Sequence, residues 1–504
     1  MTSRTRGIGR IAISAFALSQ IASTSLQAQF PLTVQPVRCG GRVPAPFSSV
    51  RPARAVVRMM AEGAFPEADA AAARALLVLI RDILGERAPV TVLSTVDILN
   101  KISSSLPAAS DTRGLAPGTR LLTTVVQRSG DSVVAVTTVR VAGRRNRPAP
   151  PGKRLAARAD DIMRLGLAIA AVAAREGADF NESMGTSPPP LGSTSAGDAY
   201  IYGLAEASGT TPVALARAKQ ALIRASDEAP ALSDVWRWRA RVERSLIEWS
   251  RETDSDDRAD LRADLLGSST RAAQLAPRSQ DAQLLLADAH LIGGDIAKAE
   301  ALVSAVASTE GESPGVARRR AVLSRIRGDD ARAQQLLVGA LLLAPRDPGL
   351  LVDLASVALT RGDRNLACHA LNAAIAVDET MAPAYALRAL VRGDLRDRRA
   401  SWIDAEIATR LGHPEWGERA AAVLDVKYGD ATQAVARLKP LGGTSAHPTN
   451  YFDAFLLSRA AVTMSRSRSA VLRVLPWLCK EYWWSFLVRD AQAVGATVGS
   501  VCPA

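Results

Sequence analysis

A Gly-Asp pair recurs at a fixed interval in the second half of the chain, and this interval limits what the chain can fold into. The pair occurs at intervals of 34 residues, at Gly294-Asp295, Gly328-Asp329 and Gly362-Asp363. The repeat continues in a less regular form at Arg396-Asp397 and Gly429-Asp430. A period of about 34 residues is typical of helix–turn–helix repeats that stack into a solenoid. Such repeats build an extended surface and seldom carry chemistry themselves. The period therefore predicts an all-α helical solenoid that functions by binding.

Small residues keep three fixed positions relative to these turns. They are Ala287, Ala321, Ala355, Ala389 and Ala422 before the turn, Ala299, Ala333, Ala367, Ser401 and Ala434 after it, and Ala340, Ala374 and Ala408 where the next repeat stacks. Small side chains at a crossing let two helices approach closely. An ordinary helical bundle would not place small residues at the same three positions over five successive repeats. Residues 281–441 therefore resemble tetratricopeptide repeats.

The residues before the repeats alternate between strand and helix patterns. The expected elements are a strand at 56–60, a helix at 68–84, a strand at 90–93, a short helix at 96–102, a hairpin of 120–127 and 132–141, and a helix at 160–175. This order predicts a small α/β domain, which makes the N-terminal part α+β. The helix at 68–84, the strand at 90–93, the hairpin turn Arg128-Ser129-Gly130-Asp131 and the helix opening with Asp160-Asp161-Ile162 resemble a TolB amino-terminal-like domain over 53–180. The resemblance implies a non-catalytic interaction module, of the kind that precedes tetratricopeptide repeats in bacterial signalling proteins.

The first residues are typical of an export signal. Arg4, Arg6 and Arg10 precede the short apolar run 11–21, and small residues follow to Ala28. The alternatives are an uncleaved anchor or an apolar start that arises by chance, and no later segment is apolar for long enough to span a bilayer. We expect an exported protein, periplasmic or associated with the cell envelope. The expected layout is a signal peptide at 1–28, an extended leader at 29–52, the α/β domain at 53–180, a Pro/Ser/Gly linker at 181–198, degenerate helical repeats at 199–280, the tetratricopeptide array at 281–441, and capping helices with a tail at 442–504.

The four cysteines fit no zinc motif, so no metal site is expected. In an oxidising compartment Cys479 and Cys502 could close the C-terminal tail with a disulfide, although both could equally be free. Cys368 falls on a repeat helix, where we expect a buried side chain. Cys39 is expected to be free.

In tetratricopeptide proteins the first helix of each pair lines the concave groove, and the resemblance implies the same here. The groove would present Asp281, Asp288, Arg318, Arg325, Ser356, Arg419 and Lys427. Its basic later half could pair with acidic side chains of an extended peptide, or these charges could simply be solvated. The Asn residues with which family members hold a terminal carboxylate are absent at the matching positions. The aromatic residues of 477–486 either cap the array or form an exposed patch, and capping is the favoured interpretation.

No catalytic constellation is recognisable. The chain has no phosphate-binding Gly-x-x-x-x-Gly-Lys loop, no Gly-x-Ser-x-Gly motif and four scattered histidines, although a site built from distant residues stays open. The net charge of +12 is dispersed and interleaved with acidic residues, and aromatics make up only 4%, so nucleic acid is not an expected partner. We expect a non-enzymatic scaffold without cofactors that binds protein or peptide partners. The alternative is a cytosolic regulatory or sensor module related to cyclase- or kinase-linked repeat proteins.

Overall fold

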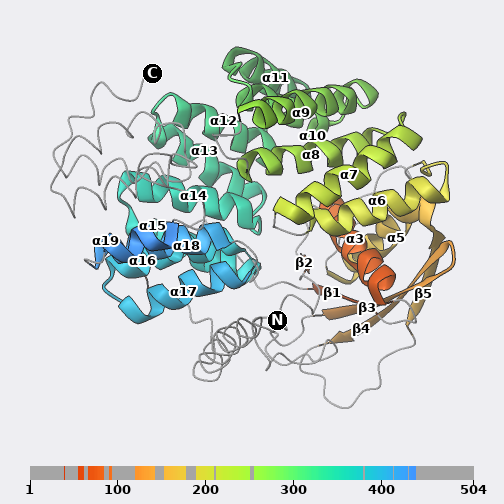
Figure 1. The fold of residues 1–504 in the computed structure, drawn as a ribbon, viewed down its shortest axis with the longest axis horizontal. Helices are drawn as coiled ribbons and strands as arrows, with labels where there is room; N and C mark the ends of the chain where they lie inside the picture. Colours follow the sequence, from red (N-terminus) through yellow and green to blue (C-terminus); the bar gives the residue numbers. More distant parts are fainter. Residues whose placement is uncertain are drawn as a thin grey trace, which may run out of the picture.

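A mixed β-sheet domain and an array of paired helices make up the fold (Figure 1). The computed structural model describes residue 39 and residues 55–61, 66–84, 90–92, 120–141, 152–177, 189–208, 212–249, 255–378, 381–411, 414–428 and 431–438. The predicted signal peptide, the leader apart from Cys39, the helix at 96–102 and the segment 442–504 with its aromatic residues lie outside them.

The N-terminal sheet has five strands in the order β2-β1-β3-β4-β5. They are β1 Ala55–Ala61, β2 Val90–Val92, β3 Arg120–Ser129, β4 Ser132–Val141 and β5 Lys153–Arg158. Strand β1 lies parallel to β2 and β3, whereas β3, β4 and β5 pair antiparallel. Gly130 has a φ of 56° in the two-residue turn of the β3–β4 hairpin, a conformation that favours glycine. The first four strands confirm the predictions, and β5 was missed.

Helices α3 (Pro66–Leu84) and α5 (Ile162–Gly177) pack against one face of this sheet. Leu76 and Ile80 of α3 and Ile169 of α5 are fully buried there, together with Leu122 and Val133 of the sheet. The helical spacing of these apolar residues explains why each helix turns one side to the strands. The predicted helices at 68–84 and 160–175 are therefore confirmed, with a short 3-10 turn, η1 (Ala159–Asp161), before α5.

The sheet domain and the first helices of the array share one hydrophobic core. Tyr200 of α6 (Thr194–Ala207), Leu222 of α7 (Pro212–Glu228) and Val235 of α8 (Ser233–Trp249) are buried in the same cluster as the sheet residues. Helix α6 also begins inside the predicted linker 181–198. The linker prediction is thus wrong from Thr194 onward, because the polar Ser193 and Thr194 start a helix rather than continue a flexible segment.

The rest of the described chain consists of consecutive helix pairs, a tetratricopeptide-type solenoid as predicted. After the α6–α7 pair, α8 pairs with α9 (Ser255–Leu275). The following pairs are α10 (Gln280–Ile292) with α11 (Ile296–Glu310), α12 (Pro314–Ile326) with α13 (Asp330–Leu343), α14 (Pro348–Arg361) with α15 (Arg364–Val377), α16 (Ala382–Asp394) with α17 (Arg398–Arg410), and α18 (Pro414–Lys427) with α19 (Ala431–Leu438).

The recurring Gly-Asp pairs have two separate roles in the turns. The glycines at 294, 328 and 362 have positive φ values between 78° and 86°, and Arg396, which replaces the glycine in the next turn, also has a φ of 61°. Each following aspartate caps the second helix, as when the Asp295 carboxylate accepts a hydrogen bond from the Lys298 backbone N–H. The small residues at 287, 321, 355, 389 and 422 are all buried at the helix crossings.

Candidate functional site

Ion pairs join successive first helices of the array. We call the surface formed by α8, α10, α12, α14, α16 and α18 the first-helix face. Its ion-pairing side chains alternate in sign from helix to helix: α8 contributes arginines, α10 aspartates, α12 arginines and α14 an aspartate. Opposite charges therefore meet at each step from α8 to α14, and this ladder contains three of the seven predicted groove residues, Asp281, Asp288 and Arg318.

The ladder begins in the sheet domain, at Asp82 of α3. Arg237 and Arg241 of α8 each place one guanidinium nitrogen on Asp82, at 2.5 and 2.6 Å, and another on Asp281 of α10, at 2.7 Å in both cases. Burial by itself would raise the pKa of Asp82, but Arg241 and Arg237 outweigh it and hold that pKa at about 2. The two arginines thus connect the sheet domain to two consecutive repeats.

Tyr200 and Asp234 extend this cluster toward α6. The Tyr200 hydroxyl donates a hydrogen bond to Asp234, whose other carboxylate oxygen pairs with Arg237. Burial, and then the neighbouring Asp234, raise the pKa of Tyr200 well above its ordinary value of 10.0, so the phenol stays protonated. Because the phenol stays neutral, it serves here as a hydrogen-bond donor that orients Asp234.

The second step of the ladder is centred on Asp288. Its carboxylate lies 2.9 Å from Arg244 of α8 and 2.7 Å from Arg319 of α12. Burial works to raise the pKa of Asp288, but Arg319 and Arg244 together lower it below its usual range. In the third step Arg318 lies 2.5 Å from Asp353 of α14, and there burial prevails and raises the pKa of Asp353.

The remaining predicted groove residues are also engaged within the chain. Arg325, with only 6% of its side chain exposed, lies 3.5 Å from Asp330 and donates to the hydroxyl of the fully buried Ser356 at 3.4 Å. Lys427 pairs with Asp394, and Arg419 is half-buried. The most exposed members of the predicted groove are Asp281 at 54%, and Arg318 and Lys427 at 35%. Sequence reasoning found these positions but missed that they pair with one another, and no comparison tests whether they bind a partner.

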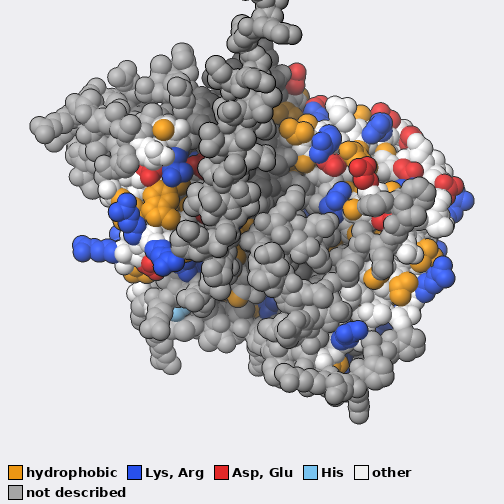
Figure 2. Space-filling view, turned by 60° about the horizontal axis from the view of Figure 1, so that its bottom comes forward, with side chains coloured by type: hydrophobic (Ala, Val, Ile, Leu, Met, Phe, Trp, Pro, Cys, Tyr) orange, Lys and Arg blue, Asp and Glu red, His pale blue; other side chains and the backbone are white. Residues whose placement is uncertain are grey.

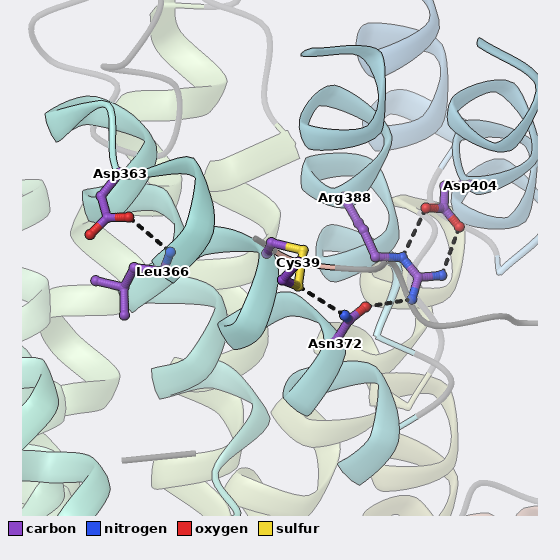
Figure 3. Close-up of a disulfide and its surroundings, with 7 residues drawn as sticks. Cys39, Asp363, Leu366, Asn372, Arg388 and Asp404 are labelled. Carbon is purple, nitrogen blue, oxygen red and sulfur yellow. Dashed lines mark hydrogen bonds and ion pairs between the residues drawn. A yellow bond between two sulfur atoms is a disulfide. The ribbon is translucent and has the colours of Figure 1, made fainter. Parts of the chain in front are cut away.

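A second cluster surrounds a disulfide between Cys39 and Cys368 of α15 (Figure 3). The Asn372 side-chain amide donates to the Cys39 sulfur at 3.3 Å, and its oxygen accepts from Arg388 at 3.2 Å. Arg388 in turn holds Asp404 of α17 with two bonds, at 2.9 and 2.8 Å. Cys368 is buried, as expected, but the interpretation that leaves Cys39 free is wrong, because the two cysteines are bonded to each other. The possible pair Cys479–Cys502 lies outside the described residues.

The described ranges contain neither a candidate metal-binding cluster nor a candidate membrane-spanning helix. Nowhere in them do three or more His, Cys, Asp or Glu side chains come together in a way that could hold a metal ion. None of the helices within these ranges combines the length and the apolar character that crossing a membrane requires.

Comparisons with known proteins give similarity at the level of helical repeats. No family model matches the chain, and no curated protein matches it. A tetratricopeptide repeat protein from Parabacteroides merdae is 14% identical with a TM-score of 0.34, over 49% of this chain and 91% of that one. The human IFIT1 dimer with PPP-AAAA is 13% identical with a TM-score of 0.42, over 66% and 77%. Yeast Tom70 is 12% identical with a TM-score of 0.36, also over 66% and 77%. At these values the likeness says nothing of what this chain binds.

Proposed function

We propose that the chain is an exported, non-enzymatic scaffold that binds protein or peptide partners at the bacterial cell envelope. The observation that carries the proposal is the first-helix face, to which six consecutive helix pairs contribute one helix each and on which ion pairs join the successive helices from α8 to α14. Solenoids use such extended surfaces for recognition. The sheet domain, which resembles a TolB amino-terminal-like domain, would act as a second, non-catalytic interaction module.

The disulfide supports export. Cys39 and Cys368 are bonded across 329 residues of sequence, and disulfides persist in oxidising compartments rather than in the cytosol. The basic and apolar N-terminal residues point the same way. The alternative, a cytosolic sensor module, would keep both thiols reduced. Fractionation and intact mass of the protein made in a bacterial host, with thiols blocked before lysis, test export: we expect an envelope or periplasmic chain beginning near Gln29, and a cytosolic chain that retains Met1 would overturn this part of the proposal.

We place the partner on α10 and α12, where the first-helix face is open to solvent. Asp281 is 54% exposed and Ile326 of α12 is 38% exposed, with the half-buried Val322 also on α12. Mixed charged and apolar side chains of this kind suit an extended peptide that carries both. Basic and acidic side chains are interspersed on the right-hand part of the described surface in Figure 2, a distribution that favours protein over nucleic acid.

Site-specific crosslinking tests this placement. A photoreactive residue at Val322 of α12 should capture a partner in intact cells, whereas the same residue at the exposed Gln335 of the second helix α13 should not. Arg318→Glu should abolish the capture from position 322 and leave the helical circular dichroism unchanged, while Arg332→Glu on α13 serves as the matched charge reversal. Equal capture from positions 322 and 335 would contradict binding at the first-helix face.

A further inference from the structure

The turns between the first and second helices of the later repeats lie next to one another along one side of the array. Asp394, the last residue of α16, lies 2.7 Å from Arg364, the first residue of α15. Asp394 also pairs with Lys427, the last residue of α18. One carboxylate therefore joins three successive turns. We call the surface formed by residues 361–364, 394–399 and 427 the turn edge.

The turn edge carries a surplus of positive charge. Asp363 and Asp397 accept hydrogen bonds from the backbone N–H groups of Leu366 and Ala400, so these two carboxylates cap α15 and α17. Asp394 is shared by two basic side chains. Against these three acidic residues the edge presents twice as many basic ones, all of them exposed: Arg361, Arg364, Arg396, Arg398, Arg399 and Lys427. Because the acidic residues are outnumbered, the edge should attract an anionic surface.

Arg396 occupies a backbone conformation that favours glycine. Its φ is 61°, and within the described ranges it is the only residue other than glycine with a positive φ. Glycine stands at the same position of the three preceding turns, at 294, 328 and 362, where the absence of a Cβ avoids the strain. Among the described residues no hydrogen bond or ion pair of the Arg396 side chain offsets this strain. Such strain is concentrated at binding sites, which makes Arg396 a candidate contact for a partner.

The composition of the turn edge favours a lipid surface over a protein or a nucleic acid. Leu395, directly before Arg396, is 47% exposed. The cores of protein interfaces are depleted of charged residues and rich in aromatic anchors, whereas this edge combines clustered arginines with one exposed leucine and no aromatic residue. Single-stranded nucleic acid would lack aromatic side chains on which to stack its bases. An anionic bilayer suits both kinds of side chain, because phosphate groups attract arginine and the boundary of the acyl chains accepts leucine.

We propose that the turn edge binds the surface of bilayers that contain anionic phospholipids. Arg361 and Arg396 contact the phosphate groups, and Leu395 enters the layer between the headgroups and the acyl chains. This assignment names the surface by which the scaffold proposed above would meet the envelope, and in that respect it rests on the proposed function. The binding is peripheral and reversible, and it weakens with rising salt because the attraction between exposed charges is screened.

Sedimentation of the full chain with lipid vesicles tests the turn edge without any protein partner. Vesicles of equal parts phosphatidylglycerol and phosphatidylcholine should bind at least about tenfold more strongly than phosphatidylcholine vesicles. Arg361→Gln combined with Arg396→Gln should weaken the binding about 25-fold, because each basic residue near an anionic surface contributes about fivefold. The matched control is Arg224→Gln combined with Arg271→Gln, exposed residues of α7 and α9, which should change the binding less than about twofold. All variants share the same N-terminal residues, whose contribution cancels in the ratios.

Arg396→Gly separates a binding role from a structural one. Glycine adopts the positive φ of this turn without strain, so the variant should unfold at a higher urea concentration than the original protein. The same variant should bind the anionic vesicles about fivefold more weakly, because it lacks one positive charge of the edge. A residue with a purely structural role would not give a more stable protein that binds less.

Four results would overturn the lipid assignment. The first is equal binding to the anionic and the neutral vesicles, and the second is an equal loss in the control pair, which would mean that only the net charge matters. The third is a lower urea midpoint for Arg396→Gly, which would show that the arginine stabilises the fold. The fourth is binding of a single-stranded oligonucleotide that depends on Arg361 and Arg396 while vesicles do not bind. Crosslinking at Val322 takes no part in these measurements, so the turn edge and the proposed function fail independently.

Discussion

Arg388 and Asp404 form a two-point ion pair in which each side chain is only 1% exposed. The pair joins α16 to α17, and Arg392 lies 3.2 Å from the same carboxylate. Burial raises the pKa of Asp404 in spite of its hydrogen bonds to Arg388, so desolvation is the dominant influence on this group. Removing one partner of such a pair is costly, because the remaining charge stays buried without compensation.

We therefore expect Arg388→Met to lower the free energy of unfolding by about 3 kcal/mol. Arg392 would still offset part of the buried negative charge of Asp404. The loss of unfolding free energy should therefore lie near the lower end of the range for broken buried ion pairs. Urea unfolding followed by circular dichroism measures it. The matched control is Arg410→Met, which removes an ion pair to Glu406 whose side chains are 32% and 53% exposed, and it should cost less than about 1 kcal/mol. If the two variants lost similar amounts of unfolding free energy, burial of the Arg388–Asp404 pair would not be what makes its removal costly.

Two helical glycines should respond to alanine with opposite signs. A Cβ at Gly197 of α6 would collide with the backbone of Ala159 and Asp160, whereas a Cβ at Gly339 of α13 would meet nothing within 4 Å. Gly197→Ala should lower the free energy of unfolding by about 1–3 kcal/mol, because α6 must move away from η1. Gly339→Ala should raise it by about 0.5–1 kcal/mol, because alanine favours a helix interior. Urea unfolding of both variants is the measurement, and a stable Gly197→Ala protein would contradict the close approach of α6 to the sheet domain.

The sequence predicted the repeat array well because the signals that define it are local. The glycine with positive φ, the capping aspartate and the small crossing residues of one pair all lie within a few turns of each other, as with Gly328, Asp329 and Ala333. Strand β5 has no such signal. Its sequence, Lys-Arg-Leu-Ala-Ala-Arg, lacks β-branched residues, and only pairing with β4 makes it a strand. Strand formation there is decided by tertiary structure.

The contacts of the candidate site depend on residues far apart in the chain. Asp281 and Asp288 were predicted as groove residues because of their repeat positions, but their pairing with arginines of α8 requires the stacking of neighbouring repeats. The bond between Cys39 and Cys368 spans 329 residues, and four cysteines offer no sequence rule for choosing partners. Periodicity therefore predicts that these residues lie on first helices, and the stacking of neighbouring repeats determines which charges pair within the chain.

The ladder should contribute measurable coupling between α12 and α14. Arg318 and Asp353 lie 2.5 Å apart, with side chains 35% and 12% exposed. Arg318→Asp and Asp353→Arg should each destabilise the protein through like-charge contacts, and the double exchange should recover part of the loss. We expect a coupling energy of about 1–2 kcal/mol from the urea unfolding of all four proteins. The same exchange at Arg320 and Glu312, a pair 40% and 42% exposed, should give less than about 1 kcal/mol. Equal couplings at the two sites would mean that Arg318 and Asp353 behave as an ordinary surface pair.

Acid should weaken the attachment of the sheet domain to the array through Asp82. Its pKa falls from the ordinary 3.8 to about 2 in the folded chain, so the ionised carboxylate stabilises the fold fully above pH 3.8 and loses this contribution as the pH falls toward 2. The shift corresponds to about 2 kcal/mol.

Asp82→Asn should therefore lose about that amount at pH 7 and show a shallower loss of stability between pH 4 and pH 2 than the original protein. Burial raises the pKa values of Asp353, Asp404 and Glu243, which gives those groups the opposite pH dependence, but they are present in both proteins and cancel in the difference. Urea unfolding at several pH values measures the two curves. If they ran parallel down to pH 2, the arginines of α8 would not be stabilising the charge on Asp82. The ion pairs would then be contacts without an energetic role in holding the two parts together.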